Sequence, residues 1–185
     1  QFITLKLTAS KSEYKSGRVL NAAWSQPDRA SISVDNVTWS QTPTCRKEDG
    51  TATYSIEAPA ETFWLAWGPP FLPTHADEVL QSLKSRLPGS TVFELAKTRG
   101  GRSVQGIRIG DANKKDAARY GVWIQARQHA WEAGSSWVGQ GFVEWLASDD
   151  PAAARLCRNA TVFYVPIMDV DNVAMGAGGK DAVPR

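Results

Sequence analysis

The chain has 185 residues, of which 42% are hydrophobic and 22% charged, and a formal net charge of only +2. This balance, with no basic run interleaved with aromatic residues, argues against a nucleic-acid-binding protein. The longest apolar run, residues 160–170, is too short to cross a bilayer, so we expect a folded, soluble protein without membrane association.

Short β-rich runs separated by Gly, Pro, Asn and Asp fill the first third of the chain, and no stretch there has a helical period. This pattern is typical of a small antiparallel β-sandwich. The expected strands are Phe2–Thr8, Ser31–Trp39, Thr51–Ala58 and Thr62–Trp67. Three prolines and a glycine in Gly68–Pro73 then interrupt regular structure, so we place a domain boundary between residues 67 and 68.

Helical and strand patterns are mixed in residues 68–185. Thr74 is expected to cap a helix, and the near-continuous apolar run Tyr120–Arg127 predicts a central strand buried on both faces. A strand, two helices and a second strand form a parallel crossover, which makes this part α/β. The expected elements are helix Thr74–Gly89, strands Thr91–Thr98 and Ser103–Gly110, a loop over Asp111–Arg119, strand Tyr120–Arg127, helix Ser135–Ser148, a helix from Pro151 and strand Ala160–Ile167.

Two candidate metal ligands, His129 and Glu132, follow the strand predicted over residues 120–127. Ligand groups in open α/β sheets gather beyond the carboxyl ends of the strands. An imidazole and a carboxylate three residues apart can reach one zinc ion if the turn between them is tight. The same spacing recurs at His75 and Glu78, where we expect only helix-start chemistry, with acids favoured by the helix dipole.

The segment VWIQARQHAWEAGSSWVGQGFVEWL (residues 122–146), followed by ATVFYVPIMDVDNV (residues 160–173), resembles the zinc metallocarboxypeptidases, particularly their cytosolic-carboxypeptidase-like branch. That branch has an Ala-Arg-x-His-x-x-Glu turn after a strand and a later Val-Pro-x-x-x-x-Asp segment, matched here by residues 165–171. The resemblance implies a β-sandwich ahead of an α/β catalytic domain, and it makes His129 and Glu132 the first two ligands of Zn²⁺. Ala130 and Trp131 depart from the usual Pro-Gly, which bears on the substrate more than on the metal.

The family's third zinc ligand, its catalytic Glu and its Asn-Arg pair for the substrate carboxylate have no match in this chain, which has only two histidines. We therefore expect an N-terminal fragment, organised as a β-sandwich (residues 1–67) and part of an α/β catalytic domain (residues 68–185). The resemblance implies a peptidase that removes C-terminal residues from peptides or proteins. The fragment by itself is expected to be inactive.

A second hypothesis is a non-catalytic binding or interaction protein that uses the β-sandwich. An incomplete sheet would also expose the strand at residues 120–127, and such an edge favours homo-oligomers. The chain begins with Gln1 rather than Met, which leaves the compartment open, with the cytoplasm favoured over export. Cys45 and Cys157 are too far apart for a CxxC motif, and we expect two separate thiols.

Several further side chains invite a specific expectation. Arg127 is expected either to form an ion pair or to orient an anion. Trp131 is a candidate for a specificity wall, and Ser135 and Ser136 are expected to cap the helix that follows them. Four tryptophans on apolar faces are expected in the core, namely Trp64, Trp67, Trp123 and Trp145. For Trp24 and Trp39 core packing is favoured over stacking on a sugar or peptide.

Overall fold

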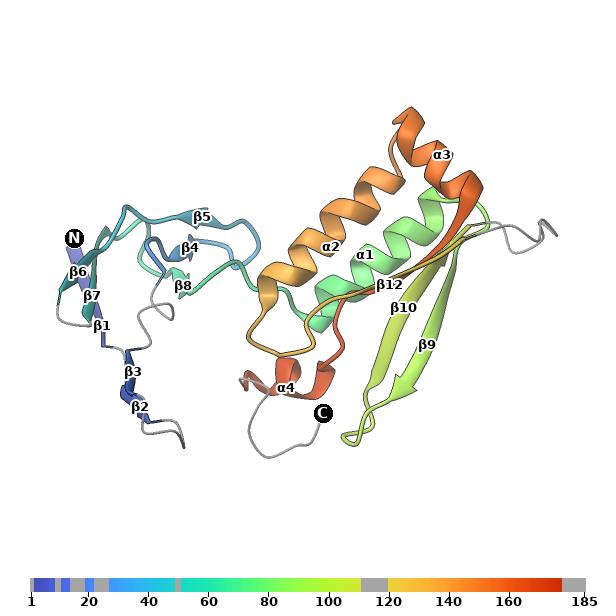
Figure 1. The fold of residues 1–185 in the computed structure, drawn as a ribbon. Coiled ribbons are helices and arrows are strands. Elements are labelled where there is room, and N and C mark those ends of the chain that lie inside the picture. Colours follow the sequence, from blue (N-terminus) through green and yellow to red (C-terminus); the bar gives the residue numbers. More distant parts are fainter. Residues whose placement is uncertain are drawn as a thin grey trace. The chain divides into compact units, whose positions relative to one another are not determined.

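A computed structural model describes residues 2–8, 11–13, 19–21, 27–48, 51–110 and 120–177. The chain divides into two compact units, residues 1–70 and residues 71–185 (Figure 1). The loop expected at residues 111–119 lies outside the described residues. No helix within the described ranges has both the length and the apolar character needed to span a bilayer.

The first unit consists of short antiparallel strands in small sheets. One sheet has the order β1 (Phe2–Thr8), β7 (Thr51–Glu57), β6 (Arg46–Glu48), and another the order β5 (Ser40–Gln41), β4 (Ser31–Ser33), β8 (Trp64–Ala66). Strands β2 (Lys11–Glu13) and β3 (Val19–Asn21) pair with each other. Alternate residues of β7 are buried, and they pack with side chains of β4 and β8, namely Ala52, Tyr54 and Ile56 with Ile32 and Leu65. The two sheets therefore share a core, as in a β-sandwich.

The strand expected over residues 31–39 is shorter in the structure because a turn interrupts it. The Asp35 carboxylate accepts hydrogen bonds from the backbone N–H groups of Val37 (2.8 Å) and Thr38 (2.7 Å). These bonds, from Val37 and then Thr38, lower the pKa of Asp35 to about 2. An Asp side chain that satisfies the backbone in this way competes with strand pairing, so β4 ends at Ser33.

The second unit contains a four-stranded sheet with the order β11-β12-β10-β9. Strands β9 (Thr91–Lys97), β10 (Ser103–Ile109) and β12 (Ala160–Val165) are antiparallel neighbours, whereas β11 (Tyr120–Gln125) runs parallel to β12. Helices α2 (Ala133–Leu146) and α3 (Pro151–Asn159) connect these two parallel strands. The predicted parallel crossover and the predicted β + α/β fold class are thus confirmed.

Helices α1 (Pro73–Arg86) and α2 lie on one face of this sheet, beside each other (Figure 1). The core between them and the sheet contains fully buried side chains from both layers, namely Leu80, Leu83, Val143, Ile107, Val162 and Tyr164. Gly139 of α2 lies directly over Tyr164, because a Cβ at this glycine would come within 2.5 Å of the tyrosine ring. The missing side chain allows the helix to approach the sheet closely.

Strand β11 corrects one expectation. The apolar run at residues 120–127 predicted a central strand, but among the described strands β11 pairs only with β12 and lies at the sheet edge. Val122 and Ile124 face the helices, whereas Trp123 lies on the other face, where its ring centroid is 5.9 Å from that of Phe163. Tyr120 is 76% exposed and Trp123 48% exposed, so Trp123 is not a core residue.

The helix starts and two further tryptophans also differ from expectation. Helix α1 begins at Pro73, with Leu72 rather than Thr74 at the N-cap, because proline is well suited to the first helical position. Helix α2 begins at Ala133, before the two serines that were expected to cap it. Trp64 (40% exposed) and Trp67 (50% exposed) were expected in a core and are partly exposed instead.

Candidate metal centre

The loop between β11 and α2, residues 126–132, is held against the chain segment that follows β12. The Ala126 N–H donates to the Val165 carbonyl (2.9 Å), and the Ala126 carbonyl accepts from the Met168 N–H (3.0 Å). The Arg127 carbonyl accepts from the Asp169 N–H at 3.1 Å. The parallel pairing of β11 and β12 thus continues beyond the strands, and it fixes the start of the loop at their carboxyl ends.

Arg127 holds the loop in shape from within. Its backbone φ is +55°, a left-handed conformation that costs a non-glycine residue about 1–2 kcal/mol. The guanidinium donates to two backbone carbonyls, from Nε to Ala130 (2.7 Å) and from Nη1 to Phe71, and the Arg127 N–H donates to Ser135 Oγ (2.9 Å). Burial lowers the pKa of this arginine. Within the described ranges its partners are carbonyls, so the expected ion pair is not observed.

His129 and Glu132 meet at the end of this loop. His129 Nδ1 lies 2.7 Å from Glu132 Oε1, and the His129 N–H donates to Glu132 Oε2 at 3.3 Å. The Glu132 N–H donates to the His129 carbonyl (3.0 Å), which closes the tight turn that the spacing requires. The two side chains are 36% and 34% exposed. Their potential ligand atoms therefore lie side by side and can be reached from solvent.

Ser135 and Ser136 support this end of α2 in ways that were not expected. Ser135 Oγ donates to the Glu132 carbonyl at 2.8 Å while it accepts the Arg127 N–H. Ser136 is fully buried, and its Oγ donates to the Pro166 carbonyl at 2.7 Å. The two hydroxyls therefore join the first turn of α2 to the loop and to the segment after β12. Trp131, within the loop, is 49% exposed.

The donor set fits zinc in kind but is incomplete in number. Imidazole nitrogen and carboxylate oxygen are both common zinc ligands, and closed or catalytic zinc sites use at least three protein ligands. No group of three or more His, Cys, Asp or Glu side chains that could hold a metal is found among the described residues. The other histidine, His75, has its Nε2 2.9 Å from Gln140 Oε1 and its ring against Phe71 and Trp137.

Asp171 also stabilises the backbone near the candidate ligands, a role that the sequence did not predict. It lies in α4 (Val170–Met175) and is 6% exposed. Its carboxylate accepts from Thr98 Oγ1, the Gly100 N–H and Arg102 Nη1, each at 2.9 Å. Burial would raise the pKa of Asp171, but these hydrogen bonds, with that from Gly100 the largest, outweigh it and lower the pKa overall. Asp171 thus ties α4 to the turn between β9 and β10, where a Cβ on Gly100 would lie 2.6 Å from the carboxylate.

The sequence profile of the zinc carboxypeptidase family matches residues 76–180, more than half of the chain. The chain belongs to the zinc carboxypeptidase family. The matched range contains β11, the loop with His129 and Glu132, and the Asp171 segment. The predicted family is therefore confirmed, whereas the assignment of the two ligands stays a prediction.

Individual relatives and solved structures agree with this membership. An uncharacterized protein of Zymomonas mobilis is 26% identical over 183 residues, which cover 95% of this chain and 46% of that protein. Cytosolic carboxypeptidase 2 of Mus musculus is 35% identical over 98 residues, which cover 52% of this chain and 10% of the mouse protein. The crystal structure of a metallo-carboxypeptidase from Burkholderia cenocepacia superimposes with a TM-score of 0.75 and 26% identity over 96% of this chain and 49% of the other. The chain thus spans half or less of the relatives that it matches.

Proposed function

We propose that this chain contributes the first two zinc ligands, His129 and Glu132, of a metallocarboxypeptidase that removes C-terminal residues from peptides. The observation that carries this proposal is the 2.7 Å approach of His129 Nδ1 to Glu132 Oε1 at the carboxyl end of β11. Family membership supplies the chemical class, because zinc in such enzymes polarises the scissile carbonyl and lowers the pKa of a bound water. The protein residues have the task of presenting the ligands.

The loop presents these ligands through a fixed backbone. Arg127 donates from Nε to the carbonyl of Ala130, and so fixes the first of the two residues between the ligands. The serine hydroxyl that accepts the Arg127 N–H also donates to the Glu132 carbonyl, which fixes the other end of the turn. A ligand set held in this way loses little conformational freedom when the metal binds. His129 would hold the ion through its imidazole, and Glu132 would hold it through its carboxylate.

The substrate that we propose is the C-terminus of a peptide or protein, and the proposed compartment is the cytoplasm. The mouse relative, named a cytosolic carboxypeptidase, supports both. Two ligands hold zinc weakly, and His75 already contacts Gln140 of α2, so our proposal assigns a further ligand and the general base to residues outside the described ones. We therefore expect the 185 residues alone to be inactive.

A binding role for the first unit is the second candidate, because this unit exposes apolar side chains at one turn. Val34 is 54% exposed and Val37 is 80% exposed, on either side of the Asp35 turn.

We also propose that β11 mediates self-association, since its outer edge carries no charged residue or proline to prevent strand pairing. Size-exclusion chromatography coupled to light scattering tests this, and a strict monomer at high concentration contradicts it.

Zinc competition with a chromogenic chelator tests the proposed ligands. We expect the chain to bind one zinc ion weakly and the variants His129→Ala and Glu132→Gln to lose this binding, with unchanged far-ultraviolet circular dichroism.

Activity is tested on the product of the complete gene, by mass spectrometry of peptides with different C-terminal residues. Release of C-terminal residues that stops with a chelator and resumes with zinc supports the proposal. Zinc binding that survives both substitutions contradicts it.

A further inference from the structure

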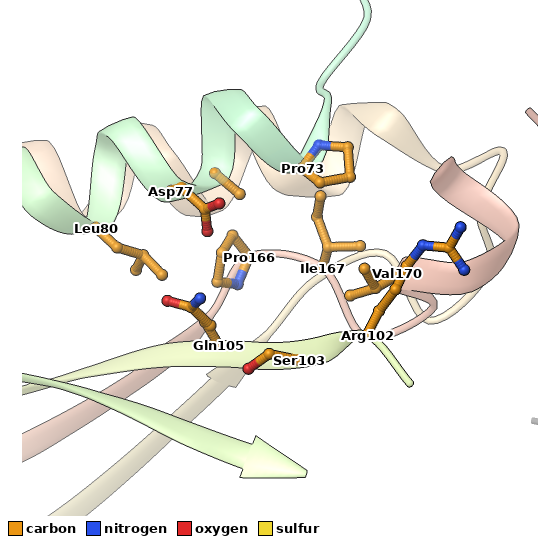
Figure 2. A pocket seen from close by; sticks show the side chains of 10 residues that line it. Pro73, Asp77, Leu80, Arg102, Ser103, Gln105, Pro166, Ile167 and Val170 are labelled. Carbon is orange, nitrogen blue, oxygen red and sulfur yellow. The ribbon is translucent and has the colours of Figure 1, made fainter. Parts of the chain in front are cut away.

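A cavity of about 230 Å³ lies between α1, the start of β10 and the segment that follows β12. Figure 2 shows it from close by. Neither His129 nor Glu132 lines it. Its walls come from three parts of the second unit, with Asp77 and Leu80 from α1, Ser103 and Gln105 from β10, and Ile167 and Val170 from the segment after β12.

Three polar side chains of this cavity have no hydrogen-bond partner within the part of the chain that the structure describes. They are the Asp77 carboxylate, the Ser103 hydroxyl and the Gln105 amide, and all three remain accessible to solvent at the mouth of the cavity. In Figure 2, Asp77 points into the space from α1 and Gln105 points toward it from β10. Asp77 is an exposed residue, and its partial burial against the cavity wall raises the pKa of its carboxyl. Polar groups that converge without partners are typical of a ligand site.

The charges around the cavity leave one acid uncompensated. Arg102 is the cation on its wall, and its Nη1 already donates to Asp171 (2.9 Å), which offsets its charge. Asp77 therefore gives the cavity a surplus of one negative charge. A cation is the occupant that this surplus favours, and an anion is disfavoured.

The rest of the wall is apolar, which favours a ligand whose uncharged part is also apolar. Leu80, Ile167 and Val170 form a surface that suits an aliphatic stem, with the charged head at Asp77. The volume is below the roughly 300–1,000 Å³ that is usual for drug-sized ligands, so the occupant is small. We propose that this cavity binds an organic cation on a short aliphatic stem, such as an alkylammonium or the side chain of a lysine. Asp77 and Gln105 are the groups that receive its head.

Nuclear magnetic resonance titration of the ¹⁵N-labelled chain with n-butylammonium tests this proposal. We expect saturable shifts of the backbone amides of Asp77, Gln105 and Ile167, with a dissociation constant in the millimolar range. The variant Asp77→Asn should weaken binding at least tenfold, and Asp77→Glu should retain most of it. Glu78→Gln is the matched control, because this acid is next in sequence, exposed and absent from the cavity wall, and it should leave binding unchanged.

Neutral and anionic probes of the same length separate the alternatives. If 1-butanol binds as well as n-butylammonium, or if butyrate binds better, the cavity does not select a positive charge and the proposal is wrong. Shifts that do not saturate would show that the cavity is not a binding site. Equal binding by N-acetyl-lysine N-methylamide identifies a peptide side chain as an acceptable source of the cation, and binding by the free amine alone identifies a small molecule. Binding should persist in His129→Ala, so failure of the metal proposal and failure of this one are distinguishable.

Discussion

The His-x-x-Glu spacing occurs in two regions of this molecule, once within α1 and once in the loop between β11 and α2. In α1 the half-buried His75 turns toward α2, where it meets Gln140 at 2.9 Å and packs against Phe71 and Trp137, with ring centroids 4.6 and 4.9 Å away. The exposed Glu78 remains on the helix surface. In the loop, by contrast, His129 and Glu132 approach to 2.7 Å.

The difference between the two regions lies in the backbone and not in the residue types. Residues three apart on a helix are neighbours, but each side chain takes the partner that packing offers. Helix α2 offers His75 the Gln140 amide and the Trp137 ring, and Phe71, just before α1, offers a second ring. In the loop, Arg127 and Ser135 fix the backbone of the turn, and the two side chains approach each other across it. A metal-ligand spacing thus becomes informative only with the structure that surrounds it.

Zinc affinity should separate the two regions most strongly. His129→Ala is expected to weaken zinc binding at least about 100-fold, because loss of a ligand exceeds the 10–100-fold cost of losing an outer partner. His75→Ala should leave the affinity within a factor of about two. Chelator competition measures both affinities, and equal losses in the two variants would contradict the assignment of His129 rather than His75 as a zinc ligand.

Arg127→Ala should disturb the loop while it leaves both ligands in place. It removes charge-assisted bonds to the carbonyls of Phe71 and Ala130, and we expect a loss of about 2–3 kcal/mol in the free energy of unfolding. Zinc affinity should fall about tenfold. Urea denaturation and chelator competition measure these effects. Arg99→Ala, at an exposed arginine of the β9–β10 turn, is the control, and a similar loss there contradicts the assignment.

His75→Ala tests the packing role of the first histidine. The substitution removes a half-buried ring and leaves the Gln140 amide without its partner, so we expect a loss of about 1–2 kcal/mol in the free energy of unfolding. Glu78→Gln, on the exposed surface of the same helix, should change it by less than about 0.5 kcal/mol. Denaturation midpoints in urea check both values. If His75→Ala leaves the free energy of unfolding unchanged, the packing of this ring does not stabilise the fold.

Asp171 should make the stability of the second unit depend on acid. Its pKa is below the ordinary value in the folded state, so its stabilisation is complete above the unfolded pKa of about 3.9 and is lost as the pH falls through the folded pKa. Asp171→Asn should lower stability at pH 7 and flatten this decline. Urea midpoints between pH 7 and pH 3 provide the measurement, and parallel curves for the two proteins would contradict the prediction.

The sequence was sufficient to predict the family, the strands at residues 91–98 and 103–110 and the parallel crossover, because these depend on motifs and on apolar periodicity. It did not predict that β11 lies at the edge, since an apolar run shows that both faces are contacted but not how many strands flank it. Helix α2 began two residues earlier than expected because its serines bond to the loop and to Pro166, and these partners are distant in sequence. The role of Arg127 depends on a positive φ and on carbonyl positions, for which a single sequence gives no signal.

The close approach of Gly139 to Tyr164 has a consequence for the aim of Glu132. The Tyr164 hydroxyl donates to the Ser136 carbonyl at 3.2 Å, one turn from the glycine, so α2 is held against β12 at two neighbouring points. Glu132 is the N-cap of this helix, about two turns before Gly139. The position of Glu132 at the start of α2 therefore depends on a glycine in the interior of the domain, because a side chain at residue 139 would push the helix away from β12.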